Sequence, residues 1–130
     1  MQYDSIKLDH IGLVVNDLEP SISWYVENFG FTIKDRFIEK DGIGLCYLQK
    51  NNTLYEIKQN PSISTQYSGK IDHIAYTSND IKSDYEYYRK KGLKIITNKI
   101  EYSKCIGNKG ADFFKILSQD DEVVEFCQRR

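Results

Sequence analysis

The chain alternates between short apolar runs typical of strands and two segments with a helical period. Residues 7–15 are rich in apolar and β-branched side chains and predict a strand. The polar pair Asn16-Asp17 that follows is a favourable helix N-cap, and Gly30 is a natural helix stop. Between them, apolar residues recur every three or four positions and predict one apolar helix stripe: Leu18, Ile22, Tyr25 and Phe29. Three more strand-like runs complete this half, over residues 31–39, 43–49 and 53–58.

The second half of the chain follows the same plan. A strand is predicted over residues 70–77, and Asn79-Asp80 caps a helix that ends at Gly92. The apolar stripe of this helix consists of Ile81, Tyr85 and Tyr88. Further strands are predicted near residues 93–97, 111–117 and 122–127, with a loop over 98–110. The polar segment 60–69 is typical of a connection between the halves.

The two halves are also related in sequence. When residues 8–25 are laid on residues 71–88, six of the 18 pairs are identical, where chance gives about one. The identical pairs are Asp9/Asp72, His10/His73, Ile11/Ile74, Asn16/Asn79, Asp17/Asp80 and Tyr25/Tyr88. The predicted fold is therefore α+β, with two β-α-β-β-β modules at about residues 5–60 and 70–130 of a single domain, 1–130. Because one helix covers only one face of a four-stranded sheet, we expect the uncovered faces to line a trough.

Composition narrows the class of protein. The 130 residues suffice for one domain, and 18 basic against 19 acidic residues give a net charge of −1, which favours no nucleic-acid partner. The longest run of apolar residues and glycine, residues 42–48, is too short to span a membrane, and no signal peptide is recognisable. Three cysteines, an odd number, favour a reduced and therefore cytoplasmic protein.

The only two histidines occupy equivalent positions in the repeat. Because alternate strand residues share a face, His10 lies on the face of Gly12, and His73 on that of Ala75. These small neighbours leave room beside each imidazole. Glu56 and Glu125 also occupy equivalent strands, and each should point away from its large apolar neighbours. A single histidine or glutamate in such a place is more often a core or solvated residue, but the duplication favours a shared role.

We expect this shared role to be metal binding. A charge in the middle of an apolar strand is costly unless it is paired or coordinated. Two neutral imidazoles and two carboxylates suit one divalent cation such as Zn, Ni, Co, Fe or Mn, and would leave open positions for water or substrate. The candidate ligands are His10, Glu56, His73 and Glu125.

The pattern resembles the vicinal oxygen chelate superfamily, which includes glyoxalase I, methylmalonyl-CoA epimerase, extradiol dioxygenases and bleomycin-resistance proteins. The opening segment 8–19 and its copy 71–81 are similar to that family's first strand and helix cap in each module. The resemblance implies the glyoxalase-like fold. It also implies that the four candidate ligands hold the metal and that Glu125 is the first choice of catalytic base, with Glu56 as the alternative.

The resemblance further implies a lyase or isomerase that transfers a proton next to a metal-bound carbonyl. A glyoxalase I-like (lactoylglutathione lyase type) reaction on a hemithioacetal comes first, with glutathione or another thiol as co-substrate. Asn60 matches the family's glutathione-contacting asparagine, whereas Val14 stands where an arginine is usual. The alternatives are a methylmalonyl-CoA epimerase-like isomerase and a metal-free protein that binds a small molecule or antibiotic. Family members often form homodimers, with ligands from one chain or two.

Overall fold

The computed structural model describes residues 3–62, 69, 71–117 and 123–130. Contacts divide the chain into two compact units, one of residues His10–Asp72 and one of Met1–Asp9 with His73–Arg130. We call them the first and second units and describe each separately. Most of the predicted connection at 60–69 lies outside the described residues, as do residues 118–122. Among the described residues, neither α-helix is long and apolar enough to cross a membrane.

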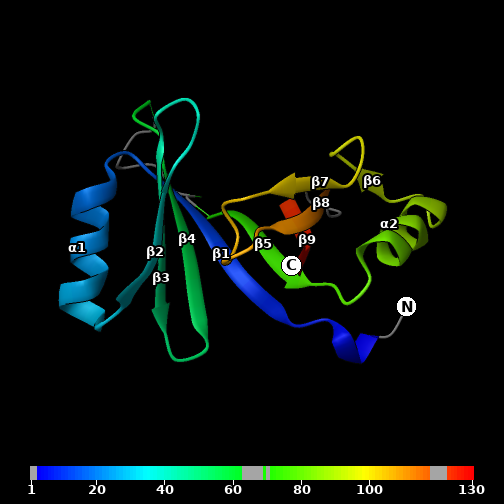
Figure 1. Cartoon of the computed structure of the whole chain (residues 1–130), viewed down its shortest axis with the longest axis horizontal. Helices are drawn as coiled ribbons and strands as arrows, with labels where there is room; N and C mark the ends of the chain where they lie inside the picture. The colour runs from blue at the N-terminus through cyan, green and yellow to red at the C-terminus, as the bar shows by residue number, and fades with distance from the viewer. Residues whose placement is uncertain (1–2, 63–68, 70, 118–122) are drawn as a thin grey trace. The chain divides into compact units, whose positions relative to one another are not determined.

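The first unit contains one helix and a four-stranded mixed sheet. Its elements are β1 (Leu8–Val15), α1 (Leu18–Phe29), β2 (Thr32–Ile38), β3 (Gly44–Lys50) and β4 (Thr53–Gln59), of which β1 begins in the second unit. The strand order is β2-β3-β4-β1, in which β1 and β4 are parallel and the other pairs are antiparallel. The predicted β-α-β-β-β order of this module is confirmed (Figure 1).

Helix α1 begins and ends where the sequence predicts. Asp17 is the N-cap in an extended conformation, and Gly30 ends the helix with a φ of 72°, a left-handed conformation that glycine adopts without strain. Leu18 and Ile22 are buried, but Phe29 is 50% exposed, so the predicted apolar stripe is not buried along its whole length. Phe29 is the last helical residue, at the turn into β2, and packs edge-on against Trp24.

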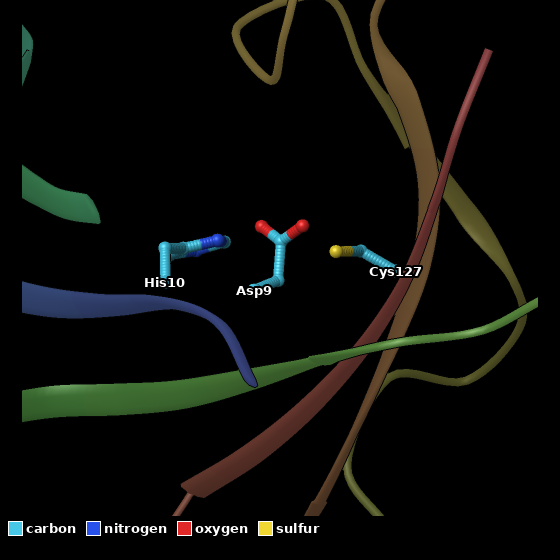
Figure 2. A group of neighbouring side chains, drawn as sticks. All are labelled: Asp9, His10 and Cys127. Atoms are coloured by element: carbon cyan, nitrogen blue, oxygen red, sulfur yellow. The ribbon is translucent and has the colours of Figure 1, made fainter. Parts of the chain in front are cut away.

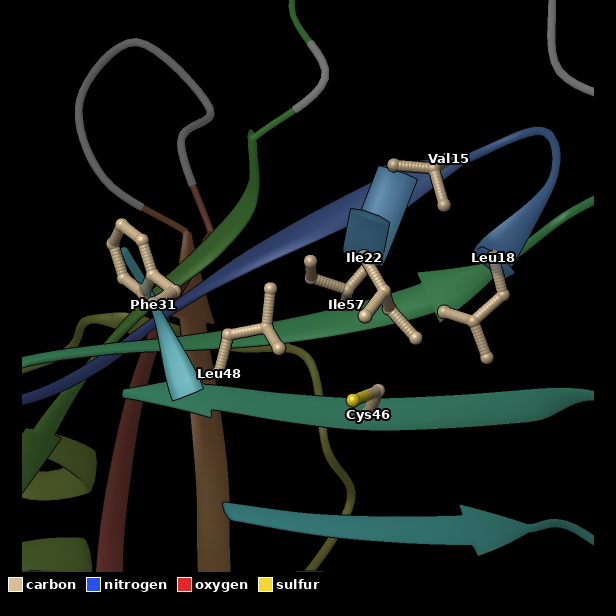
Figure 3. Close-up of a cluster of buried hydrophobic side chains, with 7 residues drawn as sticks. All are labelled: Val15, Leu18, Ile22, Phe31, Cys46, Leu48 and Ile57. Carbon is tan, nitrogen blue, oxygen red and sulfur yellow. The ribbon is translucent and has the colours of Figure 1, made fainter. Parts of the chain in front are cut away.

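A single apolar cluster joins α1 to its sheet. The buried members come from β1, the helix, β3, β4 and the residue before β2, and Figure 3 shows them gathered between the helix and the strands. Each fully buried aliphatic side chain contributes about 1.5–3 kcal/mol relative to exposure. The members are Val15, Leu18, Ile22, Phe31, Cys46, Leu48 and Ile57.

The second unit repeats the plan with one additional strand. Its elements are η1 (Tyr3–Ser5), β5 (Ile71–Thr77), α2 (Ile81–Lys90), β6 (Lys94–Ile95), β7 (Glu101–Ser103), β8 (Ala111–Leu117) and β9 (Val123–Arg129), of which β5 begins in the first unit. The order is β5-β9-β8-β6, with β5 parallel to β9, and β7 also pairs with β8. Strand β7 corrects the prediction of a continuous loop over 98–110. Its three residues show no apolar alternation and are extended because they pair with β8. The core beneath α2 contains Ile81, Phe114, Ile116 and Phe126.

Each helix starts against a glutamine from the last strand of its own unit. The Leu18 N–H donates to Gln59 Oε1 at 3.3 Å, and the Ile81 N–H donates to Gln128 Oε1 at 2.9 Å. These backbone groups would otherwise lack a helical partner. Gln59 lies three residues after Glu56, and Gln128 three residues after Glu125. The strand that carries each candidate carboxylate therefore also fixes the start of the neighbouring helix.

Candidate metal centre

In the first unit, His10 and Glu56 lie together on the sheet face opposite α1. Strand alternation places Tyr55 and Ile57 in the helix-side core and turns Glu56 the other way, as predicted. His10 Nε2 is 3.5 Å from Glu56 Oε2, and their side chains are 0% and 13% exposed. Gly12 is the β1 partner of Glu56 in the register, so no side chain from that position fills the space beside the carboxylate.

In the second unit, His73 and Glu125 form the same arrangement. Val124 and Phe126 pack in the core under α2, and Glu125 points to the other face. His73 Nε2 is 3.5 Å from Glu125 Oε2, and both side chains are 4% exposed. Ala75 is the β5 partner of Glu125 in the register, where the first unit has Gly12. The structure thus brings His10 together with Glu56 and His73 together with Glu125.

The chemistry and spacing of each pair fit a divalent cation. A nitrogen–oxygen distance of 3.5 Å is longer than the usual 2.7–3.2 Å of a direct hydrogen bond. Two ligand atoms about 2.1 Å from one ion lie roughly 3.0–3.4 Å apart in octahedral or tetrahedral geometry. The imidazole nitrogens and carboxylate oxygens are also the donor types that Zn, Ni, Co, Fe and Mn accept. The residues present therefore fit the predicted metal.

The cross-strand neighbours of the two glutamates differ. In the first unit, Tyr47 of β3 is directly opposite Glu56, and its phenol donates to Glu56 Oε2 at 2.6 Å. In the second unit, Lys115 of β8 is directly opposite Glu125, and its Nζ lies 3.9 Å from Glu125 Oε2. One carboxylate is therefore held by a neutral hydrogen-bond donor, and the other lies beside a cation.

These two neighbours do not follow from strand alternation within one segment. A signal existed for Tyr47: the two residues Asn51-Asn52 join β3 to β4, and asparagine is typical of two-residue hairpin turns. Such a turn fixes the register and places Tyr47 opposite Glu56. Asn51 has a φ of 52°, as such turns require. Lys115 had no comparable signal, because the longer connection between β8 and β9 does not set a register.

A second polar cluster lies at the start of β1 and the end of β9. Arg129 donates hydrogen bonds to both carboxylate oxygens of Asp9, at 3.0 and 2.8 Å. Figure 2 shows the Asp9 carboxylate beside the Cys127 thiol, with His10 also drawn. Burial, and then the negative charge of Asp9, raise the pKa of Cys127 far above its ordinary value. Cys127 therefore stays a neutral thiol, as expected of a packed residue. All three cysteines of the chain are buried.

Asn60, the predicted substrate contact, lies directly after β4 and is exposed. Its side-chain oxygen accepts a hydrogen bond from the Ser62 N–H at 3.1 Å, and its own N–H donates to the Val15 carbonyl at 2.7 Å. The residue thus forms a local turn and ties it to the end of β1. Its role in substrate binding stays a prediction.

Comparisons with known proteins identify the family. A family model described as the Glyoxalase/Bleomycin resistance protein/Dioxygenase superfamily matches residues 7–101. The uncharacterized protein YwbC of Bacillus subtilis (strain 168) is 34% identical over 127 residues, which cover 95% of this chain and 98% of YwbC.

Solved structures share the fold over nearly the whole chain. Hypothetical protein BH1468 from Bacillus halodurans C-125 superposes with a TM-score of 0.79 at 23% identity, covering 97% of this chain and 96% of that one. Methylmalonyl-CoA epimerase from Mycobacterium tuberculosis superposes with a TM-score of 0.80 at 19% identity, covering 100% and 93%. A methylmalonyl-CoA epimerase in complex with methylmalonyl-CoA and NH4+ gives 0.77 at 18% identity, covering 95% and 94%. The predicted α+β fold class is confirmed.

Proposed function

Because the chain belongs to the glyoxalase/bleomycin resistance protein/dioxygenase superfamily, we propose that it is a metal-dependent enzyme that moves a proton at a carbon next to a carbonyl. The observation that carries the proposal is the duplicated His–Glu pair, which occupies equivalent positions with the same 3.5 Å separation and with side chains no more than 13% exposed. The proposed ligands of one divalent cation per chain are His10, Glu56, His73 and Glu125.

The bound metal would supply a Lewis acid that polarises the substrate carbonyl and lowers the barrier to removing the neighbouring proton. His10 and His73 would hold the metal as neutral imidazoles, and Glu56 and Glu125 would balance its charge. Glu125 remains our first choice of base: its carboxylate accepts the proton from the carbon, and the resulting carboxylic acid returns it. Glu56 is the alternative base.

Lys115 favours a substrate that carries an anionic group near the reacting carbon. Its ammonium lies beside the proposed base, at 3.9 Å from Glu125 Oε2, and its side chain is 27% exposed. A carboxylate of the substrate could pair with this cation. An acyl-CoA thioester with a second carboxylate has this chemistry, and epimerases of methylmalonyl-CoA share the fold. We therefore place an epimerase-type reaction first.

A glyoxalase I-type lyase, which ranked first on the sequence, becomes the second candidate. The reacting end of a methylglyoxal hemithioacetal is uncharged, so this substrate gives Lys115 no role. The matching Asn60 is the observation that favours glutathione. A metal-free binding protein leaves the duplicated glutamates unexplained, of which Glu125 is buried and Glu56 partly buried. A homodimer and a cytoplasmic location complete the proposal.

Three measurements on the purified protein test the proposal. Elemental analysis should find about one divalent ion per chain in the wild type and less in Glu125→Gln. Proton exchange at the α-carbon of methylmalonyl-CoA in deuterated water should require that metal. Thioester formation from methylglyoxal with glutathione and other thiols, followed by ultraviolet absorbance, tests the second candidate. Absence of bound or bindable metal together with no activity in either assay would refute the enzyme proposal.

Lys115→Gln separates the two substrate classes. It should raise KM for methylmalonyl-CoA by about tenfold, the effect of losing one charge-assisted contact. The matched control is Lys90→Gln, on the exposed end of α2. An equal KM in both variants would remove the argument for an anionic substrate.

A further inference from the structure

The Tyr47 side chain is buried against the two candidate ligands of the first unit. The residue is 3% exposed, and its phenol donates to Glu56 Oε2 at 2.6 Å. Its ring meets the imidazole of His10 edge-on, with centroids 6.1 Å apart at 84°. On its other side it packs edge-on against Phe37, with centroids 6.2 Å apart at 87°. Tyr47 therefore contacts both His10 and Glu56 and is itself held in place.

The hydrogen bond to Glu56 is of the strong kind. An O–H donor on a carboxylate oxygen at 2.5–2.7 Å is charge-assisted and roughly twice as strong as a bond between neutral groups. It occupies a lone pair of Oε2 and fixes the rotation of the carboxylate. Outer partners of this type orient metal ligands in other proteins, and removing them weakens metal binding.

The second unit has a different residue at the equivalent place. Lys115 lies opposite Glu125 as Tyr47 lies opposite Glu56, but its Nζ is at ion-pair distance, 3.9 Å. The Lys115 ammonium also lies 5.8 Å from the centroid of Phe113. The phenol–carboxylate contact is thus specific to the first unit and is not a general property of the duplicated sheet.

We propose that Tyr47 is a positioning residue that holds the Glu56 carboxylate in the orientation required of a permanent metal ligand. The inference rests on the proposed metal-dependent function. It agrees with Glu125 as the base, because a carboxylate fixed by a phenol is poorly suited to leave the metal and take a proton.

The test compares Tyr47→Phe with Tyr55→Phe in titrations of the metal-free full chain with Co²⁺, followed by visible absorbance. Each variant loses only a hydroxyl, and Tyr55 is adjacent to Glu56 but belongs to the helix-side core. Tyr47→Phe should weaken Co²⁺ binding by roughly 10–100-fold and change the absorption bands of the bound ion. Tyr55→Phe should stay within about twofold of the wild type with unchanged bands.

A double-mutant cycle with Glu56→Ala shows whether Tyr47 acts through Glu56. Once the carboxylate is absent, Tyr47→Phe should cause no further loss of Co²⁺ affinity. Far-UV circular dichroism of every variant checks that it folds. Equal Co²⁺ affinity and bands in Tyr47→Phe and the wild type, or additive losses in the cycle, would overturn the role of Tyr47. Failure of the wild type to bind Co²⁺ would instead refute the proposed metal site.

Discussion

The Asp9–Arg129 pair is expected to be a major source of stability in the second unit. Arg129 binds both carboxylate oxygens of Asp9; the Asp9 side chain is 6% exposed and the Arg129 side chain 32% exposed. The contact joins the start of β1 to the end of β9, which are 120 residues apart in sequence. Replacing Arg129 by Met keeps much of the aliphatic stem but leaves the buried Asp9 carboxylate without its bidentate cation.

The expected loss follows from these exposures. Breaking a fully buried ion pair by removing one partner costs about 3–5 kcal/mol. Because Arg129 is partly exposed, solvent screening reduces this to about 2–3 kcal/mol. With an unfolding entropy of about 2.1 cal/mol/K per residue, a loss of about 2.5 kcal/mol over 130 residues lowers Tm by roughly 9 °C. Asp9→Asn, which keeps an acceptor and buries no charge, should cost less, about 1 kcal/mol.

Urea unfolding followed by tryptophan fluorescence and circular dichroism measures these differences. The double variant Asp9→Asn/Arg129→Met should be less destabilised than the sum of the single variants, because neither charge is left buried alone. Additive losses, or a loss below about 0.5 kcal/mol for Arg129→Met, the size of an ordinary surface substitution, would refute the reasoning.

Three further predictions concern the core, the helix caps and the metal. Burial raises the pKa of Cys46 above its ordinary value of 9.0, so at higher pH the unfolded chain loses a proton that the folded chain keeps. Stability should therefore fall above about pH 9 by up to 1.4 kcal/mol per pH unit, and urea titrations of Cys46→Ala should show a shallower fall. Gln128→Ala should lower the free energy of unfolding by about 1 kcal/mol, because it removes the acceptor for the Ile81 N–H. Gln59→Ala should lower it less, because the hydrogen bond from the Leu18 N–H to Gln59 is longer. Thermal unfolding of the wild type and the two variants checks this order. A divalent metal at about 100 times its Kd should stabilise the chain by about 2.7 kcal/mol, and differential scanning calorimetry should show the rise in Tm reversed by a chelator and reduced in Glu125→Gln.

Local periodicity accounts for most of the fold. The run at 7–15 and the stripe of α1 contain enough apolar residues to fix each element without tertiary information. Phe29 follows the same spacing but is half exposed, because it is the last helical residue, and spacing alone does not show how closely the end of a helix packs. Strand β7 does not follow from the apolar pattern, because its residues are extended only through their pairing with β8.

In the candidate site, too, neighbours in sequence predict some of the residues, whereas others depend on pairing between strands. Within each unit, alternation is enough to show which way a strand side chain points, so it predicts that the histidine and the glutamate turn away from the helix-side core. The partners Tyr47 and Lys115 depend on pairing between strands, which the apolar pattern alone leaves undefined. The duplication could also have revealed the helix caps, since the spacing from Glu56 to Gln59 recurs from Glu125 to Gln128.

The three-residue spacing between each glutamate and its glutamine limits where residues can be inserted into or deleted from the chain. A one-residue insertion between Glu56 and Gln59 would turn one of the two to the opposite side of β4, because side chains alternate along a strand. Either the carboxylate would move into the helix-side core or α1 would lose its starting acceptor, and the same holds for Glu125 and Gln128 in β9. Insertions and deletions in related proteins should therefore be absent from these two four-residue segments, even where the loops around them vary.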